Sequence, residues 1–129
     1  MNTLPTPLHG IVLFAHGSRD ALWRAPIEAV RQYIEAHQPE RPVRCAYLEL
    51  CTPDLPGAVH ELVQSGVQHI TIVPMFLGTG KHARHDLPVL VEALRAAHPQ
   101  VGLNVQNAVG EDPRMTALMA EIATTPPRS

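Results

Sequence analysis

The chain has 129 residues, with 12 acidic and 10 basic side chains and a formal net charge of −2. This length suits one domain with a single core, so we expect residues 1–129 to form one unit with frayed ends at 1–8 and 124–129. The near-neutral charge argues against nucleic acid as the main partner, because nucleic-acid-binding proteins normally carry a basic stripe. Eight histidines stand out in the composition, and the search for chemistry starts with them.

The apolar segments are too short to cross a membrane. The longest, 11–15 and 70–77, fall far below the roughly 20 residues that a transmembrane helix needs. The first residues lack the basic and then apolar order of a signal peptide. Cys45 and Cys51 are too few for a disulfide framework, so we expect free thiols in a reducing compartment. Together these features predict a cytoplasmic protein with no membrane partner.

The first half of the chain predicts two strands separated by a helix. A continuous apolar run over 11–15 is typical of a central parallel strand that is buried on both faces. An amphipathic helix is expected next, and its apolar face consists of Trp23, Ile27, Val30 and Ile34. The second strand, expected over 43–49, mixes polar residues with apolar ones and is therefore predicted at an edge of the sheet.

The middle of the chain repeats this pattern. A second apolar stripe runs from Leu55 to Val63, and Ser65-Gly66 is expected to end that helix. The third strand, expected over 70–76, is again apolar throughout, and Pro74 should mark the end of its pairing. The third helix carries a stripe from Leu87 to Leu94 and is expected to end at His98-Pro99.

A fourth strand is expected over 103–107, and a fourth helix follows it. Glu111 and Asp112 precede this helix and should favour its start. Its apolar stripe is predicted to lie in the core, and the residues of the stripe are Met115, Leu118, Met119 and Ile122.

This alternation predicts an α/β fold in which a four-stranded parallel sheet has helices on both faces. If the first and third strands are central and consecutive strands tend to be neighbours, the strand order is 2-1-3-4. The chain then reverses its direction across the sheet between the first and third strands. In open sheets of this kind, ligands bind at the carboxyl ends of the strands near such a reversal.

Two histidines follow the two strands that are predicted to be central. His16 comes directly after the first strand, and His82 lies in the segment after the third. Glu49 ends the second strand, so a carboxylate is expected at the same rim. Imidazole and carboxylate ligands suit divalent first-row metals, and so few ligands leave coordination positions open. We therefore expect a site that binds a metal and releases it, although Glu49 could equally be a solvated edge residue.

Positive charge and small residues surround this predicted crevice. Cations at the rim would suit a substrate that bears carboxylates, and glycine lets the backbone approach a large ligand. Surface charges of this kind are also often simply exposed. Ser18 could instead cap the next helix, and His85 is expected at the rim rather than on the metal. The candidate substrate-binding residues are Ser18, Arg19, Gly80, Lys81, Arg84 and His85.

Three segments together resemble the small, single-domain CbiX-type chelatases. They are His16-Gly17-Ser18-Arg19, Tyr47-Leu48-Glu49-Leu50 and the run from Gly80 to Pro88. The His-Gly-Ser triplet alone is a weak signal. Its combination with G-x-H-x-x-x-D-[IL]-P after the third strand is much more specific. The resemblance extends over essentially the whole globular chain.

The resemblance implies a chelatase-like fold with flavodoxin-like layering, and insertion of Co²⁺, Fe²⁺ or Ni²⁺ into sirohydrochlorin or a related tetrapyrrole on the cobalamin or siroheme routes. It makes His16 and His82 the catalytic and metal-binding pair and places Glu49 near the metal. The metal is then a substrate, and no ATP or other nucleotide and no iron–sulfur cluster is expected. Gly78-Thr79-Gly80-Lys81 is too short for a nucleotide-binding loop. The resemblance also implies a homodimer whose clefts face one another.

Two other functions fit parts of the pattern. A non-catalytic carrier of divalent metals could use the same pair of histidines, because open coordination serves transport as well as insertion. A phosphohydrolase could use His16 as a phosphate acceptor, but histidine phosphatases place an arginine directly before that histidine. Here the preceding residue is Ala15, which counts against a phosphohydrolase.

Overall fold

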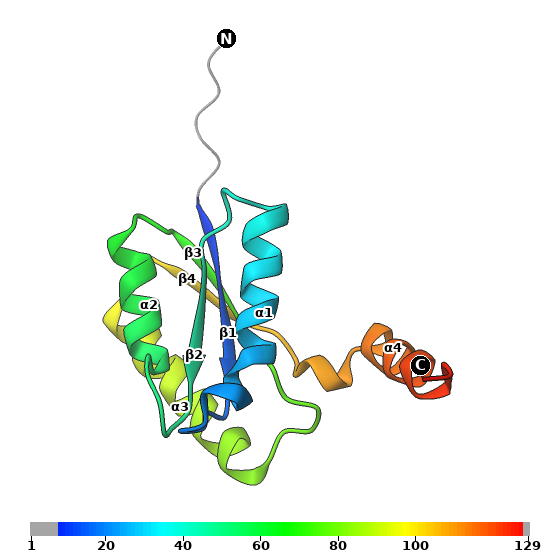
Figure 1. Ribbon diagram of the computed structural model, residues 1–129. Helices are drawn as coiled ribbons and strands as arrows, with labels where there is room; N and C mark the ends of the chain where they lie inside the picture. Colours follow the sequence, from blue (N-terminus) through cyan, green and yellow to red (C-terminus); the bar gives the residue numbers. More distant parts are fainter. Residues whose placement is uncertain (1–7, 128–129) are drawn as a thin grey trace.

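The computed structural model describes residues 8–127, so the fraying expected at 1–7 and 128–129 lies outside the described residues. Strands and helices alternate along the chain (Figure 1). The elements are β1 (His9–Ala15), α1 (Ala21–His37), β2 (Val43–Tyr47), α2 (Leu55–Gln64), β3 (His69–Pro74), α3 (Lys81–Ala97), β4 (Gly102–Val105), the 3₁₀ helix η1 (Val109–Glu111) and α4 (Pro113–Thr124).

The four strands form one parallel sheet in the order β2-β1-β3-β4. Leu13 of β1, for example, pairs with Cys45 on one side and with Val73 on the other. The predicted α/β class and the predicted strand order are therefore confirmed. Pairing of β3 with β1 ends at Pro74, as expected for a residue that has no backbone N–H to donate.

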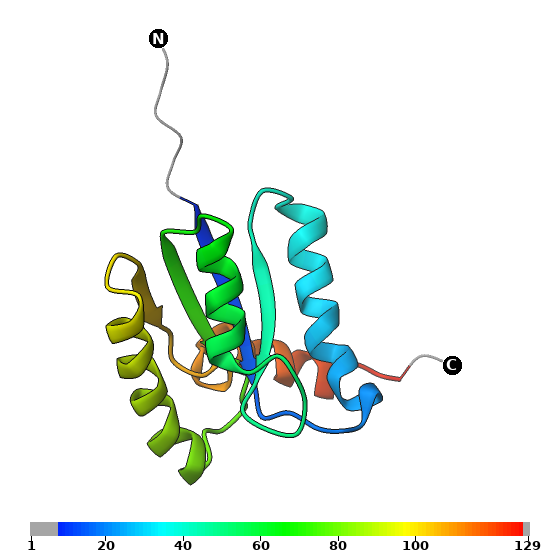
Figure 2. The same ribbon diagram turned by 90° about the vertical axis from the view of Figure 1, so that its left-hand side faces the viewer.

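Helices α2 and α3 cover one face of the sheet, here called the α2/α3 face (Figure 2). Each of these helices buries four apolar side chains, and Leu55, Ala58, Val59 and Leu62 are those of α2. The strands contribute Phe14 and Ile72, which are both fully buried, and the ring of Phe14 meets that of Phe76 edge to face. This face holds the main core of the domain. Helix α2 ends before Ser65 and α3 before His98, where the sequence predicts.

The opposite face, here called the α1 face, is covered less completely. Its cluster of buried residues comprises Leu13, Ala15, Val43, Cys45 and Tyr47, and Ile27 and Ile34 of α1 pack against it. However, no residue of α1 is itself fully buried. The predicted stripe was therefore wrong at Trp23 and Val30, which are exposed because α1 rests on the sheet along a narrow line only.

Helix α4 departs most from the prediction. Figure 1 shows it on the α1 side of the sheet, standing away from the strands. None of its residues is buried, so the prediction that its stripe belongs to the core was wrong. The sequence pattern identifies an amphipathic helix correctly, but it does not say whether the helix folds back onto its own sheet.

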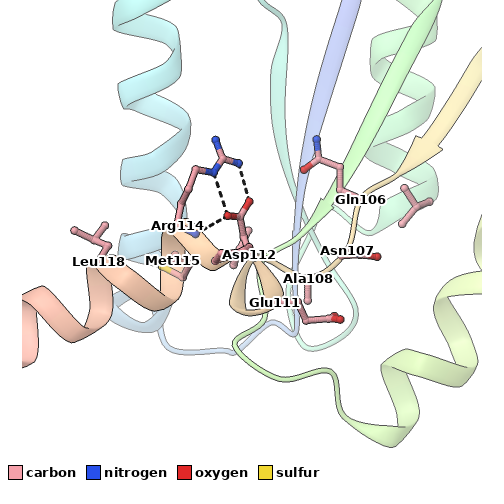
Figure 3. A pocket seen from close by; sticks show the side chains of 11 residues that line it. Gln106, Asn107, Ala108, Glu111, Asp112, Arg114, Met115 and Leu118 are labelled. Carbon is pink, nitrogen blue, oxygen red and sulfur yellow. Dashed lines mark hydrogen bonds and ion pairs between the residues drawn. The ribbon is translucent and has the colours of Figure 1, made fainter.

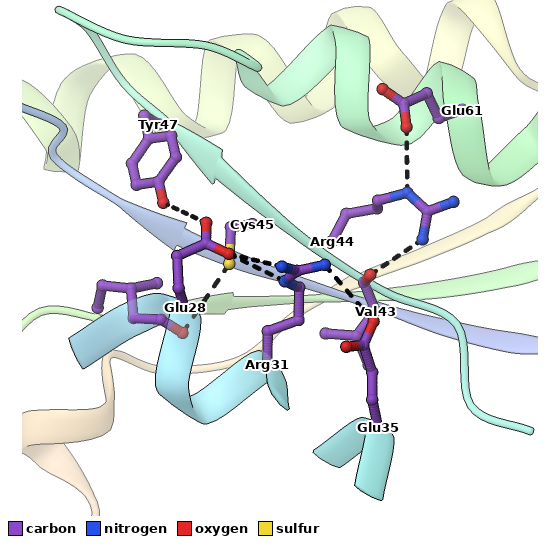
Figure 4. A network of polar contacts seen from close by, with 9 residues as sticks. Glu28, Arg31, Glu35, Val43, Arg44, Cys45, Tyr47 and Glu61 are labelled. Carbon is purple, nitrogen blue, oxygen red and sulfur yellow. Dashed lines mark hydrogen bonds and ion pairs between the residues drawn. The ribbon is translucent and has the colours of Figure 1, made fainter. Parts of the chain in front are cut away.

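A polar network joins α1 to β2 (Figure 4). The Tyr47 hydroxyl donates to the Glu28 carboxylate over 2.9 Å, and Arg31 forms an ion pair with Glu28 at 2.8 Å. Burial alone would raise the pKa of Glu28, but hydrogen bonds from Tyr47 and Cys45 and the charge of Arg31 hold it below the usual value. Burial and the neighbouring Glu28 raise the pKa of the Cys45 thiol to about 12, so this thiol is unreactive and serves packing.

Several element boundaries differ from the prediction by a few residues. Strand β2 ends at Tyr47, so Glu49 lies in the bend beyond it, and β4 ends at Val105. Helix α1 is capped by the side chain of Asp20, which accepts from the Leu22 N–H, rather than by Ser18. Thr124 belongs to α4 and not to a frayed end. No helix among the described residues combines the length and the apolar character needed to cross a bilayer.

Candidate functional site

A pocket of about 370 Å³ opens at the carboxyl ends of the central strands. It lies where the chain reverses direction across the sheet, which is the expected place for a ligand in this architecture. It is called the histidine pocket below. Its lining residues are His16, Leu48, Glu49, Gly80, Lys81, His82, Ala83 and Asp86.

The ends of β1 and β2 are joined by backbone hydrogen bonds. The Leu48 N–H donates to the Ala15 carbonyl at 2.9 Å, and the Glu49 N–H donates to the His16 carbonyl at 3.0 Å. Gly17 has a positive φ of 100°, and a side chain there would collide with the backbone oxygen of Glu49. Glycine is therefore required at this position, because only glycine combines this conformation with so close an approach. The effect is to hold His16 and Glu49 side by side.

The imidazole of His16 lies against the ring of Phe76, with the ring centroids 4.4 Å apart and the planes inclined by 31°. Phe76 is itself buried in the core of the α2/α3 face. This contact fixes one side of the His16 ring and leaves its nitrogens at the ring edge available for a proton or a metal. The position of His16 is thus determined by the best-packed part of the molecule.

The other side of the pocket is the first turn of α3. Lys81 and His82 are exposed there, while Ala83 is fully buried and anchors the turn to the core. Asp86 lies four residues after His82, so both occupy the same face of the helix. Gly80 is the N-cap of α3 and provides no side-chain hydrogen bond. The free N–H groups of the first turn of α3 therefore point toward the pocket side of the helix.

The pocket combines two imidazoles and two carboxylates with one ammonium group. The ion pairs found between residues 8 and 127 lie elsewhere, and none includes a side chain of the histidine pocket. Within the same residues, no three His, Cys, Asp or Glu side chains gather closely enough to hold a metal ion. His16, His82 and Glu49 thus share one pocket without forming a closed ligand set.

The other predicted substrate contacts lie outside this pocket. The Ser18 hydroxyl accepts from the Asp20 N–H at 3.0 Å within the loop, and Arg19 and His85 are exposed. Arg84 lines a separate cavity of about 380 Å³ between α3 and the end of β4. Of the six candidates, Gly80 and Lys81 line the histidine pocket.

The sequence analysis missed Asp86 and Phe76 as members of the site. Asp86 could have been found from its spacing of four residues after His82, which places two polar side chains on one face of a helix. Phe76 shows no such signal, because a buried phenylalanine at the end of an apolar run looks like any core residue.

A larger hollow, of about 790 Å³, lies at the base of α4 (Figure 3). Its wall includes Asp112, whose carboxylate accepts from the Arg114 side chain at 2.7 and 3.0 Å and from the Arg114 N–H at 2.8 Å. These bonds lower the pKa of Asp112 to about 2. The hollow contains neither of the two candidate histidines, so it is not part of the histidine pocket.

The fold and the pocket define an α/β protein of the open-sheet class, with a polar pocket where the sheet topology reverses. The family model described as CbiX matches residues 10–125. The chain therefore belongs to the CbiX family, as the sequence motifs predict.

Curated relatives and solved structures agree with this assignment. The chain is 36% identical over 81 residues to a protein of Methanopyrus kandleri named sirohydrochlorin cobaltochelatase, an alignment that covers 63% of this chain and 57% of the relative. The crystal structure of a CbiX protein from Marinobacter aquaeolei VT8 superimposes with a TM-score of 0.73 at 34% identity, over 89% of this chain and 93% of that one.

Larger relatives show the same fold over part of their length. SirB from Bacillus subtilis, in a structure with Fe³⁺, superimposes with a TM-score of 0.74 at 26% identity, over 92% of this chain and 48% of that one. The chain spans less than two thirds of the length of the two cobaltochelatases that it matches at 36% and 32% identity.

Proposed function

We propose that this protein inserts a divalent metal, Co²⁺ or Fe²⁺, into sirohydrochlorin or a closely related tetrapyrrole. The observation that carries the proposal is the meeting of His16 and His82, from the end of β1 and the first turn of α3, in one open pocket. The names of the relatives, which are sirohydrochlorin cobaltochelatases and ferrochelatases, support the same reaction.

The chemistry of metal insertion explains why two histidines are needed. Insertion removes two pyrrole N–H protons from the macrocycle while the metal exchanges its water ligands for nitrogens. An imidazole coordinates a metal only when neutral, and it accepts a proton with an ordinary pKa of about 6.5. Metal binding and proton acceptance therefore compete at one ring, and a second ring allows the two tasks to be divided.

The surroundings of the two rings favour a particular division. His16 is held against Phe76, so it is the better placed to keep a metal at a constant position. His82 is exposed on the first turn of α3 and is free to take a proton and pass it to solvent. Glu49 and Asp86 offset the charge of the incoming cation. Because the ligand set is open, the metal can leave toward the macrocycle.

Cations around the pocket suit the carboxylates of the tetrapyrrole. Lys81 lines the pocket and is not part of any ion pair among the described residues, so its ammonium group can bind a substrate carboxylate. Gly80 lets the macrocycle approach the start of α3. We assign Ser18, Arg19, Arg84 and His85 to carboxylates that extend beyond the pocket.

The finer points of the function are also proposals. We propose that the reaction needs no nucleotide and no iron–sulfur cluster, that Ni²⁺ is accepted as a third metal, and that the protein acts in the cytoplasm. We further propose that it works as a homodimer. The overlapping ligand preferences of these metals support the wider metal range.

The test is an anaerobic assay of the absorbance change of sirohydrochlorin with Co²⁺, Fe²⁺ or Ni²⁺. We expect His16→Ala and His82→Ala each to lower the rate by about 100-fold or more, because each loses a ligand or a base. His60→Ala, which changes an exposed histidine of α2, is the matched control and should keep the wild-type rate. Near-normal rates in both pocket variants would contradict the assignment of this site.

The same variants separate insertion from simple metal carriage and test the division of roles. Binding of Co²⁺ by the wild-type protein without any acceleration of insertion would indicate a carrier. If His82 acts mainly as the base, His82→Ala should bind Co²⁺ with near-normal affinity in a titration and yet lose turnover. His16→Ala should lose both. The reverse pattern would exchange the two roles.

A further inference from the structure

Helix α4 has an unusual surface for a helix that is exposed to water. Of its 12 residues only Arg114 and Glu121 are charged, and the others are apolar, small or hydroxyl-bearing. Leu118 is 49% exposed and Ile122 is 65% exposed. A helix that is solvated all round normally carries many charges, and an isolated helix of this length is only marginally stable in water. The sequence of α4 is therefore that of a helix that packs on something.

Contacts of η1 with the segment after β3 fix where the chain enters α4. The Gly110 N–H of η1 donates to the Phe76 carbonyl over 2.9 Å, and a side chain at Gly110 would collide with the backbone of Leu77. Asp112 caps the helix and binds the guanidinium of Arg114 (Figure 3). The connection thus holds α4 away from its own sheet, and the hollow of about 790 Å³ at its base separates it from the end of β4.

The same chain leaves open a surface that such a helix would cover. On β3, Ile70 and Ile72 point to the α2/α3 face and are 1% and 0% exposed. Val73 and Met75 pack with the cluster of the α1 face and stay half-buried, because α1 packs on β2 and β1. In a three-layer α/β fold, the position beside α1 and over β3 normally holds a helix. In this structure no helix covers that position over β3, although the same chain carries the uncovered helix α4.

We propose that two copies of this chain exchange α4, each laying the apolar side of the helix over β3 on the α1 face of the other copy. The inference rests on the proposed homodimer and specifies how it is built. The occupant is a second copy because both complementary surfaces belong to this chain, and within one copy the connection through η1 leads α4 away from the open surface. Such an exchange is reciprocal, so a two-fold dimer covers the apolar side of α4 and the open surface over β3 in both copies.

The first test is the oligomeric state, measured by size-exclusion chromatography with light scattering. We expect a dimer for the wild-type protein and a dissociation constant raised about 30-fold or more in Leu118→Glu and in Ile122→Glu, because each places a charge in the interface. Val89→Glu changes a side chain of α3 that is 63% exposed on the other face, and it should remain dimeric. A cooperative thermal unfolding transition in all three variants should show that the sheet and its core still fold, since no residue of α4 is buried.

The outcomes separate the exchange from the wider proposals. A monomeric wild-type protein at all concentrations would overturn both the homodimer and the exchange. A dimer that survives Leu118→Glu and Ile122→Glu would overturn the exchange alone. Neither result touches metal insertion, which is measured separately by the absorbance assay.

A second test distinguishes exchange from closure of α4 onto its own sheet. Ile122→Cys and Val73→Cys are combined with Cys45→Ala and Cys51→Ala, and the protein is treated with a short bismaleimide. Exchange predicts a covalent dimer on a denaturing gel. When copies that carry only one of the new cysteines are mixed, the same product should form between them. A crosslink within a monomer, or no crosslink between these positions, would overturn the proposal.

Discussion

The two faces of the sheet differ in how much apolar surface their helices bury. On the α2/α3 face, each helix contributes four buried side chains, and Phe14 and Ile72 from the strands are fully enclosed. On the α1 face, no residue of α1 or α4 is itself buried, and the contacts of α1 with the sheet include the polar network around Glu28. The α2/α3 face is therefore a fully packed core, whereas the α1 face leaves apolar surface that a partner could cover.

This difference bears on where the site lies. The ring of His16 packs against Phe76, and the buried Ala83 holds the first turn of α3, which carries His82. Residues of the α2/α3 core therefore position both histidines. The proposed catalytic pair would need a well-packed support, and this face supplies it. The α1 face, with its half-buried residues, is free to take part in assembly without disturbing the pair.

The largest expected effect tests the packed face. Phe14→Ala should lower the free energy of unfolding by about 3–5 kcal/mol, because it removes a fully buried ring and leaves a cavity. Ile34→Ala on the half-covered α1 face should cost no more than about 1–2 kcal/mol. Urea unfolding on a Leu118→Glu background measures both without a contribution from dimerisation. Equal costs on the two faces would contradict the comparison.

A smaller effect tests the polar network of the α1 face. Tyr47→Phe should lower the free energy of unfolding by about 1 kcal/mol, because it removes the part-buried hydrogen bond from the Tyr47 hydroxyl to the Glu28 carboxylate. The matched control is Tyr33→Phe, since Tyr33 is largely exposed on α1 and should tolerate the change. A loss at Tyr33 as large as that at Tyr47 would show that the network is not what holds α1.

The pH dependence of stability sharpens the same point. The pKa of Glu28 in the folded protein lies below its ordinary value of 4.5, so its ionised form stabilises the fold. This contribution is complete above pH 4.5 and is lost as the pH falls through the lower folded-state pKa. The stability gap between wild type and Glu28→Gln should therefore be widest at neutral pH and narrow below pH 4.5 in urea unfolding. A stability difference between wild type and Glu28→Gln that grows as the pH falls would contradict the lowered pKa of Glu28.

The smallest expected effects are at exposed apolar positions. Leu22→Ser on α1 and Val89→Ser on α3 change side chains that are 81% and 63% exposed, and each should alter the free energy of unfolding by less than about 0.5 kcal/mol. Thermal unfolding of the two variants beside wild type checks this. A marked loss at Leu22 alone would extend the partner surface of the α1 face to the start of α1.

Much of the fold could be predicted because local patterns carry it. The continuous apolar runs of β1 and β3 indicate buried central strands, and the mixed pattern of β2 indicates an edge. His16 was found for a related reason, since a histidine directly after a central strand must lie at the ligand-binding edge of the sheet. The position of Asp86 was within reach of the same reasoning, through its helical spacing from His82.

Other features depend on contacts between distant segments. The contact of Phe76 with His16 joins the segments that follow β3 and β1, and the close approach of Gly17 to Glu49 depends on how β1 and β2 end together. Neither follows from spacing along the chain, because both arise from the register and the closing of the loops.

The sequence alone determined the α/β class, the strand order and the family resemblance, and it predicted that His16 and His82 lie at one edge of the sheet, because periodicity and short motifs are local properties. Only the tertiary structure decided the course of α4. An amphipathic stripe indicates that a helix will be covered, but not by which chain. The course of α4 follows from the turn through Gly110, which leads the helix away from its own sheet.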